Sequence, residues 1–227
     1  MKAAGGKIKA LLAALLVLSA VQPDSEGKDS ADNAGTGTKE QKLMVSGGPA
    51  AAFIASNFVH SPMEDGRSVM KYGFGAGGFV DLGIKDWFSI QFELMLGYEE
   101  SEFVRLGETR TFRHAGLELP IYAMFHIPAD GCGRINAGIG PFTDFGLWGA
   151  YGAGNSWHDV YDRDKSTGLS TMKDNYSGIA VKAGYEFNFG LQINCCYRIS
   201  LSNVLDENSS LVRMHPQTAS FEIAYRF

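Results

Sequence analysis

Apolar and polar residues alternate with a period of two over most of the chain from Leu43 onward, where no helical period of 3.6 residues is present. Alternation of this kind is typical of β-strands that turn one face to an apolar environment. The clearest run is 88–98, in which large apolar residues alternate with residues that are mostly polar or small. The same pattern recurs at 117–127, 179–189, 191–201 and 221–227.

Two glycine-rich runs, 72–84 and 134–149, keep this parity, and a less regular run covers 44–58, so the sequence predicts eight strands. Pro49 and Pro120 fall inside two of the runs. Because proline cannot donate to a strand ladder, we expect bulges or strand ends at both positions. The predicted long connections are 59–71, 99–112, 150–175 and 203–216, and the short ones are 85–86, 128–133 and 189–190.

Long and short connections that alternate in this way are typical of an up-and-down barrel in an outer membrane, with the long loops outside and the tight turns in the periplasm. Each clear run is also long enough to cross a bilayer at a tilt. The predicted fold class is therefore all-β, an eight-stranded antiparallel up-and-down transmembrane β-barrel.

The composition of the two strand faces separates this barrel from a soluble one. A lipocalin-like barrel points its apolar face inward and shows Lys, Thr and Glu outside. Here the polar face holds mainly Gly, Ser, Asn and Ala with sparse charges, and Gly makes up 28 of the 227 residues. The opposite face is almost purely Leu, Ile, Val, Phe and Tyr, as contact with lipid requires. A soluble secreted barrel is the alternative.

Aromatic residues gather near the predicted strand ends. We expect two interfacial girdles, one at the short turns and one at the long loops. The alternative is the ordinary preference of aromatic residues for strands. The short-turn set is Trp87, Phe88, Phe125, Phe187, Phe189 and Phe227, and the long-loop set is Tyr72, Tyr98, Trp148 and Tyr176.

Ten charged residues fall on the inward parity, and in a narrow lumen they must pair because an unpaired buried charge is costly. Alignment of the last hairpins predicts Arg198 near Glu222 and Lys182 near Arg198, with Glu118 or Glu93 reaching them from across the lumen. An eight-stranded barrel has room only for its own side chains, so this network predicts a plugged lumen. The ten are Asp81, Glu93, Glu118, Asp144, Glu186, Glu222, Arg134, Lys182, Arg198 and Arg226.

The N-terminal segment predicts export. Residues 1–20 combine three lysines, a short apolar run and a small-residue end, which is the pattern of a secretory signal peptide. Residues 21–42 are rich in Asp, Ser, Gly and Lys and predict a disordered leader, so that the barrel domain spans 43–227. The predicted location is the cell outer membrane.

Candidate chemistry is sparse. Ser156, His158 and Asp159 are close together in the longest predicted loop, but catalytic triads usually combine distant segments, and an ordinary polar loop is the favoured interpretation. The aspartates Asp159, Asp162, Asp164 and Asp174 lack the spacing of a calcium-binding loop.

Neither the cysteines nor the net charge adds a site. Cys132 lies in a short turn, and Cys195 and Cys196 point to opposite faces of one strand, so no disulfide framework is implied. The net charge of −5 gives no basis for nucleic-acid binding. We therefore expect no catalytic, cofactor-binding or metal-ligating residues and no cofactor.

Several segments carry a family resemblance. The C-terminal run 219–227 ends in Phe227, as the last strand of an outer-membrane barrel does. The segments 118–122 (ELPIY), 136–142 (NAGIGPF) and 178–198 resemble, in this order, the PorT-like outer-membrane β-barrel family. The resemblance implies an eight-stranded barrel inserted by the barrel-assembly machinery, and it does not imply one activity, since only some members are tied to secretion or gliding machinery.

The expected function is a non-enzymatic outer-membrane barrel whose outer loops serve binding, secretion or envelope roles. Expected contacts are outer-membrane lipid, the barrel-assembly machinery and a protein partner or surface ligand at loop 150–175, without nucleic acid. The alternatives are an enzyme acting on lipid or peptide at the outer rim and a small porin-like channel.

Overall fold

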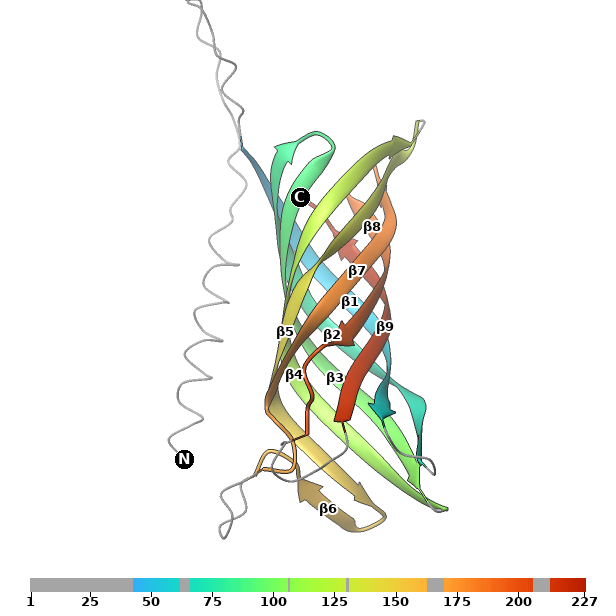
Figure 1. The fold of residues 1–227 in the computed structure, drawn as a ribbon. Helices are drawn as coiled ribbons and strands as arrows, with labels where there is room; N and C mark the ends of the chain where they lie inside the picture. Colours follow the sequence, from blue (N-terminus) through green and yellow to red (C-terminus); the bar gives the residue numbers. More distant parts are fainter. Residues whose placement is uncertain (1–42, 62–65, 106, 130, 163–169, 206–212) are drawn as a thin grey trace, which may run out of the picture.

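Eight strands close into an antiparallel barrel in the computed structural model, which describes residues 43–61, 66–105, 107–129, 131–162, 170–205 and 213–227. Neighbours pair in the order β4–β3–β2–β1–β9–β8–β7–β5, and the pairing of β4 with β5 closes the ring (Figure 1). The strands are β1 Met44–Ser61, β2 Gly66–Lys85, β3 Phe88–Arg105, β4 Glu108–Ala129, β5 Gly133–Ala153, β6 Ser156–Asp159, β7 Asn175–Phe187, β8 Leu191–Ser200 and β9 Arg213–Tyr225. The predicted fold class is confirmed.

The barrel has two unlike ends. The short-turn end carries the β2–β3, β4–β5 and β7–β8 turns and the C-terminus, and the loop end carries the other connections (Figure 1). Gly131 and Gly190 adopt φ of 84° and 92° in two of the short turns, a conformation that glycine adopts without strain. Short β6 pairs with residues 150–153 of β5 and forms a hairpin beyond the barrel at the loop end. No described helix could cross a membrane.

Several predicted connections are strands. The predicted loops 59–71 and 99–112 are wrong over most of their length, because β1 continues to Ser61, β2 begins at Gly66, and β3 and β4 pair as far as Arg105 and Glu108. Residues 66–70 pair with 101–105 through the backbone, which needs no apolar face. The polar composition of these extensions therefore concealed them. The loops 150–175 and 203–216 likewise lose residues to β5, β6, β7 and β9.

The two prolines mark neither bulges nor strand ends, so that prediction is wrong. Pro49 lies within β1 and pairs with Gly78 of β2, one residue before the β1–β9 ladder begins at Ala50. Pro120 lies within β4 and pairs with Phe142, and the β3–β4 ladder is interrupted beside it without a change of register. Each proline thus lies at a position where no ladder hydrogen bond requires a backbone N–H.

The outward face is the predicted apolar one. Leu96, Leu119, Ile121, Ile139 and Ile223 are all exposed there, as are most other large apolar side chains of the strands. At the short-turn end, Trp87 and Phe88 pack against Phe125, and Phe187 stacks on Phe189. One girdle assignment is wrong. Tyr176 faces inward, where its ring contacts Phe142 and His114, because it pairs with the inward-facing Asp144.

We expect deletion of Phe227 to reduce barrel insertion more than deletion of residues 163–169. The Phe227 N–H donates to the Gly47 carbonyl at 3.0 Å and ties the end of the chain to β1, while its side chain stays exposed. The measurement is the heat-modifiable fraction of each variant in isolated membranes. Equal insertion of the two variants would show that the terminal residue is unimportant.

Candidate functional site

The interior of the barrel holds the predicted charges. Eight of the ten are buried, while Arg134 and Arg226 are partly exposed at the short-turn end. The prediction that these side chains face inward is confirmed for the eight, which are Asp81, Glu93, Glu118, Asp144, Lys182, Glu186, Arg198 and Glu222.

Lys182 lies at the centre of one cluster, with a side chain that is 1% exposed. Its Nζ donates to Glu93 and, at 2.8 Å, to Glu222, and it lies 5.2 Å from the ring centroid of Tyr122. Asn194 Nδ2 donates to the same Glu222 oxygen at 3.0 Å. One ammonium group is thus shared by two buried carboxylates, one from β3 and one from β9.

Arg198 forms the second cluster. Its Nη1 donates to Glu118, and its Nη2 lies 3.6 Å from Glu99 Oε1. The predicted approach of Arg198 to Glu222 is wrong, because the β8–β9 register places Asn194 opposite Glu222. This register depends on how the residues of the long β8–β9 connection divide between its two arms. Alignment of the sequence through a long loop does not determine that division.

The predicted nearness of Lys182 and Arg198 agrees with the β7–β8 register, which makes them diagonal neighbours on the inward face. Lys182 lies opposite Cys196, and each of the two bases binds its own acids. The prediction that Glu93 or Glu118 reaches these bases from across the lumen is confirmed, Glu93 for Lys182 and Glu118 for Arg198.

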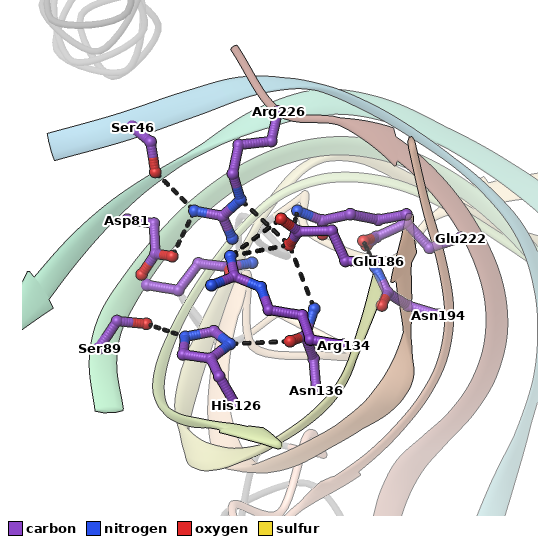
Figure 2. Close-up of polar contacts among 12 residues, drawn as sticks. Ser46, Asp81, Ser89, His126, Arg134, Asn136, Glu186, Asn194, Glu222 and Arg226 are labelled. Carbon is purple, nitrogen blue, oxygen red and sulfur yellow. Dashed lines mark hydrogen bonds and ion pairs between the residues drawn. The ribbon is translucent and has the colours of Figure 1, made fainter. Parts of the chain in front are cut away.

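A third cluster lies at the short-turn end (Figure 2). Arg226 donates through Nη1 to Ser46 Oγ and Asp81 Oδ2, both at 2.5 Å, and through Nε to Glu186 Oε2 at 3.1 Å. Arg134 Nη2 donates to both oxygens of Glu186 at 2.9 and 3.0 Å. Since Arg226 directly follows the end of β9 and Ser46 lies on β1, this cluster spans the seam between the first and last strands.

The loop end is covered by side chains from the connections. Phe58, Val160, Met172 and Val204 form a buried apolar cluster there. Below it, Tyr161 Oη lies 2.7 Å from His114 Nδ1, and His114 Nε2 lies 2.9 Å from Asp144 Oδ1. Burial, with the nearby Asp144 charge, raises the pKa of the Tyr161 phenol well above its ordinary value. A neutral phenol therefore covers the mouth.

Two small cavities lie under this cover. One, of about 20 Å³, is lined by residues of the loop end that include Glu99, His114 and Tyr161. The other, also about 20 Å³, lies deeper and shares Glu99 and His114 with the first. Each has room for about one water molecule.

Two glycines of β5 form a cradle for Tyr161. A Cβ at Gly146 would lie 2.6 Å from the Tyr161 ring, and a Cβ at Gly149 would lie 2.7 Å from both Tyr161 and Val160. A Cβ at such a distance would displace the Tyr161 ring, so the ring fits there because both positions are glycine. The sequence predicts both glycines as part of a strand and does not predict their contact with Tyr161.

We expect Gly146→Ala to displace Tyr161 and to destabilise the loop end by about 1–3 kcal/mol, the usual cost of overpacking. The measurement is the urea unfolding midpoint of the folded barrel together with tryptophan fluorescence. Tyr161→Ala should remove most of the added effect of Gly146→Ala, because the ring that clashes is then absent. Additive effects of the two substitutions would contradict the cradle.

The candidate catalytic residues of the outer loop do not form a triad. Ser156 Oγ lies 3.4 Å from His158 Nε2, and both side chains are exposed. Asp159 Oδ1 instead accepts from the Tyr161 N–H at 2.8 Å. Asp164 lies outside the described residues, and within them no group of three His, Cys, Asp or Glu side chains is arranged to hold a metal ion. Cys132, Cys195 and Cys196 are free, and Cys195 is exposed while Cys196 is buried, as predicted.

Sequence reasoning missed two histidine sites. His114 meets Asp144 and Tyr161 through three segments whose registers were not known. His126 binds Ser89 and Asn136 at the short-turn end. The second could have been anticipated in part, because the tight turn at 129–133 places His126 directly opposite Asn136.

These features belong to a known class of protein. The chain belongs to the outer membrane protein beta-barrel domain family, whose model matches residues 31–206. It is an outer-membrane β-barrel protein, and the outward face of its barrel is apolar. No curated protein sequence matches the chain.

Three solved structures are similar to this chain at low identity. The outer membrane protein OprG of Pseudomonas aeruginosa matches with a TM-score of 0.50 and 10% identity, over 81% of this chain and 95% of that one. Neisserial surface protein A matches with a TM-score of 0.45 and 11% identity, over 80% and 97% of the two chains. The attachment invasion locus protein Ail of Yersinia pestis matches with a TM-score of 0.41 and 12% identity, over 80% and 98%.

Proposed function

We propose that this protein is a closed, PorT-like barrel that acts by presenting its loop end to a partner or surface ligand outside the cell. The observation that carries the closed lumen is the sharing of each interior base by two acids, which fixes side chains across the bore. The predicted signal peptide at 1–20, which would direct export, and the predicted leader at 21–42 lie outside the described residues.

The binding role rests on the hairpin of β5 and β6. Its outward face exposes Trp157, and Arg113 lies 4.3 Å from the centroid of that ring while its Nε pairs with Glu100 at 2.9 Å. Aromatic and arginine side chains exposed together are frequent in binding surfaces. A groove of about 410 Å³ also opens at the hairpin, lined by residues that include Arg110 and His158. We infer that this end binds and that Ser156 and His158 perform no catalysis.

Removal of the hairpin shortens the β4–β5 ladder by its last pairs and leaves the ladder from Gly149 to Gly133 in place. Val160 N–H donates to the Gly149 carbonyl at 3.1 Å, so the two ends of the hairpin already meet. We expect a variant in which Gly-Gly replaces residues 150–159 to insert and remain heat-modifiable while losing its partner in pull-downs from detergent extracts. Trp157→Ala in the full-length hairpin is the matched single variant. Capture of the same partners by all three proteins would remove the hairpin from the proposal.

We expect negligible conductance from the parent protein in planar bilayers. The reason is geometric, since the interior side chains of an eight-stranded barrel fill its bore. Steady channels of porin size would overturn the closed lumen and favour the alternative of a small channel.

A further inference from the structure

A serine, a histidine and an asparagine from three neighbouring strands are aligned at the short-turn end (Figure 2). Ser89 Oγ of β3 lies 2.7 Å from His126 Nε2 of β4, and His126 Nδ1 lies 2.7 Å from Asn136 Oδ1 of β5. All three side chains are buried. The proposed binding role does not use them.

The neighbours of Asn136 determine where the protons lie. Asn136 Nδ2 donates to Glu186 Oε2 at 3.3 Å, and that carboxylate also receives donors from Arg134, Arg226 and Gln192. The amide oxygen of Asn136 therefore points to His126 and can only accept, so His126 Nδ1 carries the proton. His126 Nε2 is left with its lone pair, and the Ser89 hydroxyl donates to it.

This proton order is the one that an activated serine requires. In such sites the nucleophile donates to a histidine whose other nitrogen is held by a third residue, and the constellation is recognised by geometry and not by position in the sequence. We propose that Ser89 is the nucleophile of an acyl-transfer site that accepts a small carboxylic ester, with His126 as general base and Asn136 as a positioning residue.

The strand geometry leaves a route to Ser89. It is the first inward-facing residue of β3, and its cross-strand partner is Gly83 of β2. A Cβ at Gly83 would meet only Met44, at 3.3 and 3.4 Å, and Met44 is 67% exposed at the mouth. The atoms at these distances are the Cβ and the backbone oxygen of Met44, so a shift of this exposed first residue of β1 opens the space beside Ser89, which limits the substrate to a small ester.

A hydrogen-bond donor for the developing oxyanion is also available. Arg134 Nε is buried and has no hydrogen-bond partner among the described residues. Arg134 lies on the same inward face of β5 as Asn136, two residues away. Its free N–H is the candidate donor, since stabilisation of the oxyanion commonly contributes most to the acceleration of acyl transfer.

The reaction is a two-step hydrolysis that needs only water as co-reactant. Ser89 Oγ attacks the ester carbonyl carbon as its proton passes to His126 Nε2, and the alcohol then leaves with that proton, which gives an acyl-Ser89. Water attacks the acyl group, returns a proton through His126 and releases the carboxylic acid. No group is oxidised or reduced.

The test uses a small fluorophosphonate, which forms a phosphorus–oxygen bond with an activated serine and releases fluoride. We expect the folded, detergent-solubilised barrel to be labelled at Ser89, as located by mass spectrometry, and not at Ser200. Ser200 is the matched control, because it is equally buried but its Oγ donates to backbone carbonyls and not to an imidazole. His126→Gln should lower the labelling rate about 100-fold or more, the usual contribution of a general base.

A second variant separates chemistry from folding. Gly83→Val should slow labelling because it fills the route, although it leaves Ser89, His126 and Asn136 unchanged. Heat-modifiability verifies that each variant is folded, and hydrolysis of p-nitrophenyl acetate, lost in Ser89→Ala, is the second readout. Absence of label on the folded parent, label only after heating, or equal rates in the parent and folded His126→Gln would each overturn the proposal.

Discussion

Replacement of Lys182 by alanine is expected to destabilise the barrel by about 3–5 kcal/mol, the usual cost of leaving buried charges without their partner. The substitution removes the only cation that contacts Glu93 and Glu222 among the described residues, and both carboxylates are buried. The effect should appear as a lower urea midpoint of the folded barrel in micelles. Arg198→Ala should act in the same direction through Glu118 and Glu99.

Two comparisons make this result specific. Lys71→Ala removes an ion pair with Glu102 whose lysine is 39% exposed, and we expect a change of roughly 0–1 kcal/mol. The triple variant Lys182→Met, Glu93→Gln, Glu222→Gln removes both the charge and its partners and should recover most of the lost stability. A Lys182→Ala protein as stable as Lys71→Ala would contradict the shared ion pair.

Arg226→Ala is expected to weaken closure of the barrel, with a loss of about 2–4 kcal/mol after allowance for its partial exposure. The guanidinium joins β9 to Ser46 of β1, Asp81 of β2 and Glu186 of β7, and it lies 5.3 Å from the Phe79 ring centroid. We expect the first and last strands to pair late in folding, because their contacts are the most distant in sequence. The expected result is a lower heat-modifiable fraction and a lower urea midpoint.

Arg134→Ala is the matched control for Arg226→Ala. Arg134 also donates to Glu186, but its side chain is 31% exposed, and Glu186 is the acid it pairs with among the described residues. A smaller loss of stability is therefore expected. If Arg134→Ala reduced closure as much as Arg226→Ala, the seam would have no special dependence on Arg226.

The face that each residue occupies could be predicted from the sequence, because the period of two assigns parity without knowledge of pairing. Ile121 and Ile139 face outward and Glu93 and Lys182 face inward, as expected. The strand extensions at the loop end could not be predicted in this way. Residues 66–70 and 101–105 carry no apolar stripe, and only their backbone pairing reveals them.

Partners across the lumen could be predicted only by chemical type. The sequence required acids near Lys182 and Arg198, and Glu93 and Glu118 fulfil that role. The position of each side chain along the barrel axis depends on the register of several strands at once. The sequence therefore predicts the wrong glutamate as the neighbour of Arg198. The pairing of His126 with Asn136 depends on a single tight turn, so it could have been predicted from the sequence.

Adjacent Cys195 and Cys196 point to lipid and to the interior, and Arg198 follows two residues later on the interior face. A slip of β8 by one residue would exchange these environments and would bring Arg198 into hydrocarbon, where a cation costs about 2–4 kcal/mol at the bilayer midplane. It would also leave Glu118 and Glu99 without a cation. The interior ion pairs thus favour one alignment of each strand, so strand register depends on the charged residues as well as on the apolar stripe.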